Sequence, residues 1–423
     1  MRHNLRVVGG SPWFFFGATS LTMPFLLFST FLPTWSPIAA IVFLTAAGLL
    51  RCYATGRVLG HTPADWALLL VLLTLPVSLW ASADHHTTLP RVYAFIANLA
   101  VFWAVAALAK STPLRWTGWG ILVASLMLTG IFLSGTHFGA AKLPFIDRHI
   151  YSILPSGLKP FWNEEGFNAN LAGGVLALFL PSAMILAIAG ESWLQRCIAL
   201  ITFVILVIML LLAQSRGALI AVMISLPVMT ILYKKHWLWF WLVIATTGVA
   251  LLIVYGNEIS FETILGNDST LGDISSLQSR VELWSRAIYM IQDFPFTGVG
   301  LGMFEPVVKL LYPTFLLAPD VVFQHAHNIY FQTAAEMGIP GLIGHLALYS
   351  TLTILLVRRI IQPQQDRDQY RVIALGLFGG LLVYLVHGIF DAISFYLRTA
   401  FVIWIIFGLI VAISTSLGWN VAE

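Results

Sequence analysis

Long apolar segments follow one another along most of this chain and leave few polar residues to cover a surface that faces water. Charged residues make up 10% of the chain and hydrophobic residues 59%, whereas a soluble domain carries roughly 25% charged residues. The composition therefore predicts a protein whose solvent is lipid. A net charge of +3 is too small to indicate a nucleic-acid partner. The two cysteines, Cys52 and Cys197, have the spacing of neither a disulfide framework nor a ligand cluster.

The apolar segments are long enough to cross a bilayer, because a transmembrane helix needs about 20 apolar residues. The candidate spans lie at 13–32, 35–50, 64–82, 92–109, 116–134, 168–189, 193–213, 217–233, 237–256, 326–357, 372–389 and 395–415. The span at 326–357 is too long for one crossing. Pro340, between Gly338 and Gly341, is expected to break it into a short helix at 326–338 and a crossing helix at 341–357.

The fold class that follows is an all-α, polytopic integral membrane protein with about twelve transmembrane helices and a large outer loop that contains short helices. Residues 1–256 hold helices one to nine, residues 257–325 the loop domain, and residues 326–423 helices ten to twelve. With both termini in the cytoplasm, 13 lysines and arginines fall inside and nine outside, in agreement with the positive-inside rule. This orientation places both long loops, 135–167 and 257–325, outside.

The loop at 257–325 contains a segment with helical periodicity, which Asp293 and Pro295 end. Five apolar residues recur there at the spacing of one helix face: Leu277, Val281, Trp284, Ile288 and Ile291. The pattern predicts an amphipathic helix that lies over the outer membrane surface.

Two histidines, His325 and His327, open the segment "QHAHNIYFQTAAEMGIPG". In a helix, residues two apart point about 200° from each other and hold one ion poorly. No third ligand stands close in sequence, so we predict no metal here. Two interpretations remain open: both rings are interfacial and face water, or one histidine is catalytic or binds substrate. The second is attractive because the charge of histidine changes near neutral pH.

Two of three outer arginines are candidates for binding an anion. Arg216, in "AQSRGALI", is either an interfacial arginine that extends to water or a contact to an anion such as phosphate. Arg280 and Arg286 are six residues apart on the loop helix and point to different sides. We expect Arg280 to face the same site as Arg216, whereas Arg286 is a solvated residue or pairs with Glu282.

Polar residues elsewhere have competing interpretations. Asn168 and Asn170, in "NANLAGG", either cap a span whose Gly173 and Gly174 allow close packing or contact substrate. The "DRD" motif at 366–368 is typical of metal-dependent glycosyltransferases. It falls in a loop of mixed charge, so we expect it to be solvated.

Four motifs together resemble those of the bacterial O-antigen ligase and polymerase superfamily. They are "NANLAG" at the start of one span, "SRGA" after another, R-x-x-x-W in the outer loop, and "AHNIYFQTAAEMGIPGL" after it. The chain is most similar to the O-antigen ligases. That resemblance implies the transfer of a glycan from undecaprenyl diphosphate to the lipid A–core on the periplasmic face of the bacterial inner membrane, a step of lipopolysaccharide biosynthesis.

The resemblance also implies roles for individual residues. His327 would activate or orient the acceptor hydroxyl. Arg216 and Arg280 would hold the diphosphate and stabilise its growing charge. Three asparagines would contact substrate: Asn168, Asn170 and Asn328.

The implied reaction needs no metal and no cofactor, and its partners are the lipid-linked glycan donor, the lipid A–core acceptor and membrane lipid; a monomer would suffice. A polysaccharide polymerase and a protein O-oligosaccharyltransferase remain alternatives, because they use the same donor. A transporter is a further alternative from another class. It would carry ionisable groups at the membrane midplane and internal repeats, whereas the polar residues here gather at one surface.

Overall fold

The computed structural model describes residues 7, 10–27, 35–56, 61–136, 138, 149–153, 166–255, 277–317, 321–362, 368–395 and 399–415. Several predicted features lie outside these residues: most of the loop at 135–167, the first part of the loop domain at 257–276, and Asp366 and Arg367 of the "DRD" motif.

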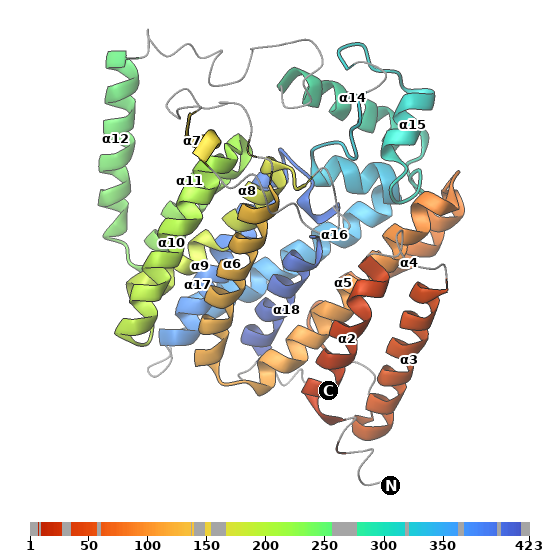
Figure 1. The fold of residues 1–423 in the computed structure, drawn as a ribbon, viewed down its shortest axis with the longest axis horizontal. Coiled ribbons are helices and arrows are strands. Elements are labelled where there is room, and N and C mark those ends of the chain that lie inside the picture. The colour runs from red at the N-terminus through yellow and green to blue at the C-terminus, as the bar shows by residue number, and fades with distance from the viewer. Residues whose placement is uncertain are drawn as a thin grey trace.

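The described residues form helices and no strand, as the composition predicts (Figure 1). The helices are α2 (Pro12–Leu27), α3 (Ser36–Thr55), α4 (Asp65–Ala81), α5 (His85–Ser111), α6 (Leu114–Gly135), α7 (His149–Ile153), α8 (Ala169–Ala177), α9 (Leu180–Ala189), α10 (Trp193–Ala213), α11 (Arg216–Tyr233), α12 (Trp237–Tyr255), α14 (Leu277–Asp293), α15 (Phe304–Leu311), α16 (Ile329–Ile361), α17 (Asp368–His387) and α18 (Phe401–Thr415). A short 3-10 turn covers Ile393–Phe395.

Within the described residues, eight helical segments are long and apolar enough to cross a membrane, α8 and α9 together counting as one. Four shorter apolar helices accompany them, at Pro12–Leu27, Asp65–Ala81, Trp237–Ala250 and Phe401–Thr415. The all-α, polytopic membrane fold is therefore confirmed. The number of twelve crossings stays a prediction.

Exposed tryptophans mark the two ends of the bundle. Each of those found among the described residues lies within three positions of an end of an apolar helix: Trp13, Trp35, Trp66, Trp80, Trp116, Trp193 and Trp239. Tryptophan favours the membrane–water interface, where its ring is half in lipid and its N–H meets water. This distribution supports a membrane that spans the bundle between these ends.

The loop helices α14 and α15 lie across one end of the bundle, opposite the turn between α5 and α6 (Figure 1). The long helix α16 is broken below them at Gly338, whose φ of 71° and ψ of 177° are not helical. The break stands two residues before Pro340 and confirms the predicted division of this segment. The N–H of Ile339, freed by the break, donates to the carbonyl of Pro295 at 2.7 Å.

The glycine-rich segment after α14 closes onto the same break. Val299 N–H donates to Ala335 O at 2.9 Å, and Gly300 N–H to Glu336 O at 3.1 Å. Gly298 has a φ of 63°, and a Cβ there would lie 2.4 Å from the carbonyl carbon of Glu336. Glycine is required at this position by both its conformation and the close approach. The contacts fix α14 relative to the first half of α16.

The loop helix α14 does not bury its most apolar face. Leu277, Val281 and Ile288 keep 40%, 51% and 40% of their surface exposed. The buried side is a different set, which includes two charged residues: Ser279, Glu282, Leu283, Arg286, Ala287 and Met290. Hydrophobic periodicity alone therefore does not set the rotation of this helix.

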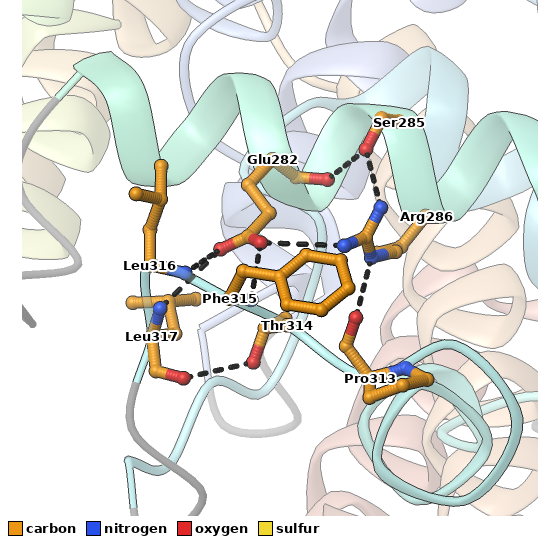
Figure 2. Close-up of polar contacts among 8 residues, drawn as sticks. All are labelled: Glu282, Ser285, Arg286, Pro313, Thr314, Phe315, Leu316 and Leu317. Carbon is orange, nitrogen blue, oxygen red and sulfur yellow. Dashed lines mark hydrogen bonds and ion pairs between the residues drawn. The ribbon is translucent and has the colours of Figure 1, made fainter.

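A polar network involving Glu282 and Arg286 fixes the rotation of α14 instead (Figure 2). The Glu282 carboxylate accepts hydrogen bonds from the backbone N–H groups of residues 315–317, at 2.5, 3.0 and 3.3 Å. Arg286 Nη2 lies 3.3 Å from Glu282 Oε1, and its Nε donates to Pro313 O at 3.0 Å. Arg286 thus pairs with Glu282, as one of the two sequence interpretations proposed, and the solvated alternative is wrong.

Candidate active site

Two turns that are distant in sequence meet beneath α14. The first, residues 325–328, precedes α16, and the second, residues 388–391, follows α17. Ile329 N–H donates to Gly388 O at 2.7 Å. Asn328 joins them as well: its Oδ1 caps α16 by accepting from the N–H groups of residues 330 and 331, and its Nδ2 donates to Ile389 O at 3.1 Å.

The meeting of the turns brings Asp391 to His327, and both residues are buried. His327 Nδ1 lies 3.2 Å from Asp391 Oδ1. Burial alone would raise the pKa of Asp391, but the hydrogen bond from His327 and the neighbouring rings of His325 and His387 hold it well below its usual value. A carboxylate only accepts, so Nδ1 of His327 carries the hydrogen. In the neutral ring of His327 the lone pair is then on Nε2, where it can take a proton.

His325 supports this arrangement from the other side. Its Nδ1 accepts a hydrogen bond from the backbone N–H of His327 at 3.2 Å, and the two ring centroids are 4.4 Å apart. His327 has a φ of 52°, a left-handed conformation that is uncommon outside glycine and is often found at functional sites. Burial lowers the pKa of His325 to about 3, with the charge of His327 acting in the same direction, so His325 stays neutral near pH 7.

One possible ligand atom from each of His325, His327 and Asp391 lies within 4.8 Å of the others, a spacing that could hold a metal ion. Asp391 is the third ligand that the sequence reasoning did not find. A neutral imidazole, however, has a single lone pair, and His325 uses it at Nδ1 to accept from the backbone. Its Nε2, which then carries the hydrogen, lies 3.7 Å from Asp391 Oδ1. The hydrogen bonds favour proton transfer over metal binding, and the absence of a metal stays a prediction.

His387, at the end of α17, is a further buried member of the site that the sequence reasoning missed. Its ring fills the space left by two glycines on other helices. A Cβ at Gly174 of α8 would lie 2.6 Å from His387 Cε1, and one at Gly217 of α11 would lie 3.5 Å from its Cδ2. Helices α8 and α11 therefore both pack against His387. The "HGIFD" sequence gave a usable signal, because ionisable residues at the end of an apolar span are often functional.

Several buried polar atoms around these residues lack a hydrogen-bond partner within the part of the chain that the structure describes. They include Arg280 Nε, His387 Nδ1 and Asp391 Oδ2. Leaving such an atom unpaired costs about 1–3 kcal/mol. Arg280 is close enough for its positive charge to contribute to the low pKa of His325, after burial, His327 and Arg91. The described part of the site therefore holds a buried donor at Arg280 Nε and a buried acceptor at Asp391 Oδ2.

Residues 201–346 match the family model described as O-antigen ligase. Over this domain the chain is similar to the O-antigen ligase family. The domain runs from within α10 to the second half of α16 and contains Arg216, Arg280 and His327. Asp391 and His387 lie beyond it, so the site combines this domain with the end of α17. Comparison with curated proteins gave no match.

The predicted site residues lie at the ends of their helices or in the turns beside them. His327 lies in the cluster, Arg280 acts on it electrostatically, and Arg216 begins α11 beside Gly217, which packs against His387. The side chain of Asn328 caps α16 and donates a hydrogen bond to the turn at residues 388–391. Asn168 caps α8 by accepting from Asn170 N at 2.8 Å. Substrate contacts by the three asparagines stay predictions.

Gly174→Ala tests the packing of His387. The added methyl group would meet the His387 ring, and overpacking of this kind costs about 1–3 kcal/mol. We expect a lower unfolding temperature and reduced turnover. Gly120→Ala is the matched control, because a Cβ at that helical glycine has no neighbour within 4 Å. Equal unfolding temperatures and rates for the two variants would contradict the packing argument.

Proposed function

We propose that the protein is an O-antigen ligase that transfers a glycan from undecaprenyl diphosphate to a sugar hydroxyl of the lipid A–core. The proposal also places the active site on the periplasmic face of a bacterial inner membrane. The observation that carries it is the His327–Asp391 pair beside Arg280, joined to an O-antigen ligase domain at one end of a membrane bundle.

The chemistry is a single displacement. The acceptor hydroxyl oxygen forms a bond to the anomeric carbon of the donor's first sugar, and the bond from that carbon to the phosphate oxygen breaks. Undecaprenyl diphosphate leaves with the electron pair. His327 Nε2 takes the hydroxyl proton and later releases it to solvent, while Asp391 stabilises the imidazolium through Nδ1.

The arginines supply the charge that the leaving group requires. Arg280 would bind the diphosphate from α14, and Arg216 would do so from the start of α11. A hydrogen bond to a charged group is worth about 1.5–3 kcal/mol, so the loss of either guanidinium should reduce turnover about tenfold to a hundredfold. The lipid chains of donor and acceptor would lie against apolar helix surfaces.

An acceptor test separates this reaction from its alternatives. The purified protein in detergent is supplied with undecaprenyl-diphosphate glycan, with and without lipid A–core, in the presence of EDTA. We expect product only when lipid A–core is added. A ladder of longer glycans without the acceptor would mean a polymerase. Product that forms only after a divalent metal replaces EDTA would overturn the metal-independent mechanism and return attention to the His325–His327–Asp391 cluster.

A further inference from the structure

Trp284 follows Arg280 by one helical turn on α14 and also has a buried donor without a partner among the described residues. Trp284 Nε1 is buried and has no hydrogen-bond partner among the described residues, and the same holds for Arg280 Nε. An indole N–H can donate a hydrogen bond but cannot accept one. Only an acceptor atom can satisfy it, and a buried donor without an acceptor is costly.

The indole ring is held in place by its neighbours. Its centroid lies 6.2 Å from that of Phe331, in the first turn of α16. The same turn begins at the Asn328 cap, next to His327. Trp284 therefore lies on α14 where this helix faces the first turn of α16, the helix that follows the histidines.

The rotation of α14 directs both donors to this place. Residues four apart on a helix lie on the same face, so Arg280 and Trp284 share one side of α14. The Glu282–Arg286 network fixes the rotation by holding the opposite side of the helix against residues 313–317 (Figure 2). This rotation of α14 leaves apolar side chains exposed and buries the donor atoms of Arg280 and Trp284.

The chemistry of these donors indicates their ligand. One is part of a permanent cation and the other is neutral, and both lack an acceptor. A group with several acceptor oxygens and negative charge satisfies both, as a diphosphate does. We propose that Trp284 is a second donor to the diphosphate of the lipid-linked substrate, with its Nε1–H bound to a phosphate oxygen beside Arg280. The inference rests on the proposed function and adds a neutral donor to it.

Trp284→Phe is the test, because phenylalanine keeps an aromatic ring against Phe331 and removes only the N–H and part of the ring. Trp103→Phe on α5 is the matched control. Trp103 Nε1 is also buried without a partner among the described residues, but it lies on a helix outside the site. The probes are inorganic pyrophosphate and undecaprenyl diphosphate, titrated onto each purified full-length variant by calorimetry.

We expect Trp284→Phe to weaken binding of both probes and to raise the donor KM about tenfold to a hundredfold. The acceptor KM and the unfolding temperature should stay the same, and Trp103→Phe should bind like the wild type. Unchanged binding in Trp284→Phe would overturn the proposal, as would a wild type that binds neither probe. A wild type that binds both probes but transfers no glycan to lipid A–core would refute the proposed function. The binding data would in that case still decide whether Trp284 donates to the diphosphate.

Discussion

Replacing His327 with asparagine should lower the turnover number about 100- to 10,000-fold, the range that general base catalysis contributes. Asparagine is one of the few residues that tolerates a left-handed backbone, and His327 has a φ of 52°. The variant should therefore fold while lacking a nitrogen that takes a proton. Donor binding should persist, because the arginines that bind the diphosphate are unchanged. Steady-state rates with donor and acceptor both saturating measure the effect.

Asp391→Asn should lower the turnover number by a similar factor, but for a different reason. The amide can donate to His327 Nδ1, which the carboxylate cannot do, so it permits the tautomer with the hydrogen on Nε2. A protonated Nε2 is unable to accept the hydroxyl proton. The fall in rate should come without a fall in donor affinity.

His345→Gln is the control for both variants. His345 is as buried as the site histidines and bonds to Gly341 O at 2.9 Å, one helical turn away, but it belongs to the second half of α16. Its replacement should leave the rate within a few-fold of wild type. A His327→Asn enzyme that turns over as fast as His345→Gln would rule out proton abstraction by His327.

Glu282→Ala should have the largest effect on the stability of the loop helices. The change removes the acceptor for three backbone N–H groups and leaves Arg286 buried without its anion. Breaking a buried ion pair by removing one partner costs about 3–5 kcal/mol. We expect faster amide exchange in residues 313–317 and along α14. Turnover should also fall, because α14 would no longer hold Arg280 in one position.

Glu305→Ala on α15 is the matched control. Glu305 also pairs with a cation four residues away, Lys309 at 2.9 Å, but the two side chains are 21% and 37% exposed. An exposed pair of this kind contributes about 0–1 kcal/mol. If amide exchange and turnover responded equally to the two substitutions, the Glu282 network would not determine the position of α14.

The apolar helices could be located approximately because their cause is local. A bilayer imposes a minimum apolar length on each helix, and that length is readable in the sequence without knowledge of contacts. The break near Pro340 was predictable for the same reason, although it falls on Gly338, where the contact with the Pro295 carbonyl requires a non-helical backbone. The cap formed by Asn168 is likewise a local effect.

The candidate site was predictable only in part. His327 and Arg280 stood out as polar residues at the ends of apolar segments. Asp391 and His387 did not, because they are far from the histidine motif in sequence, and only the contact between the two turns brings Asp391 within 3.2 Å of His327. Asp391 is thus a possible third metal ligand despite its distance in sequence. The hydrogen bond that His325 Nδ1 accepts is what disfavours a metal at this cluster.

The rotation of α14 shows most clearly where local patterns stop being informative. Periodicity identified the helix and its apolar face, yet Leu277, Val281 and Ile288 remain exposed. Bonds from Glu282 to residues more than 30 positions away decide which side is buried. The sequence by itself determined that lipid is the solvent, approximately where the apolar helices lie, and which polar residues stand near their ends. The tertiary structure alone decided which of those residues meet, because hydrogen bonds and ion pairs form between atoms that are close in space, whatever their separation along the chain.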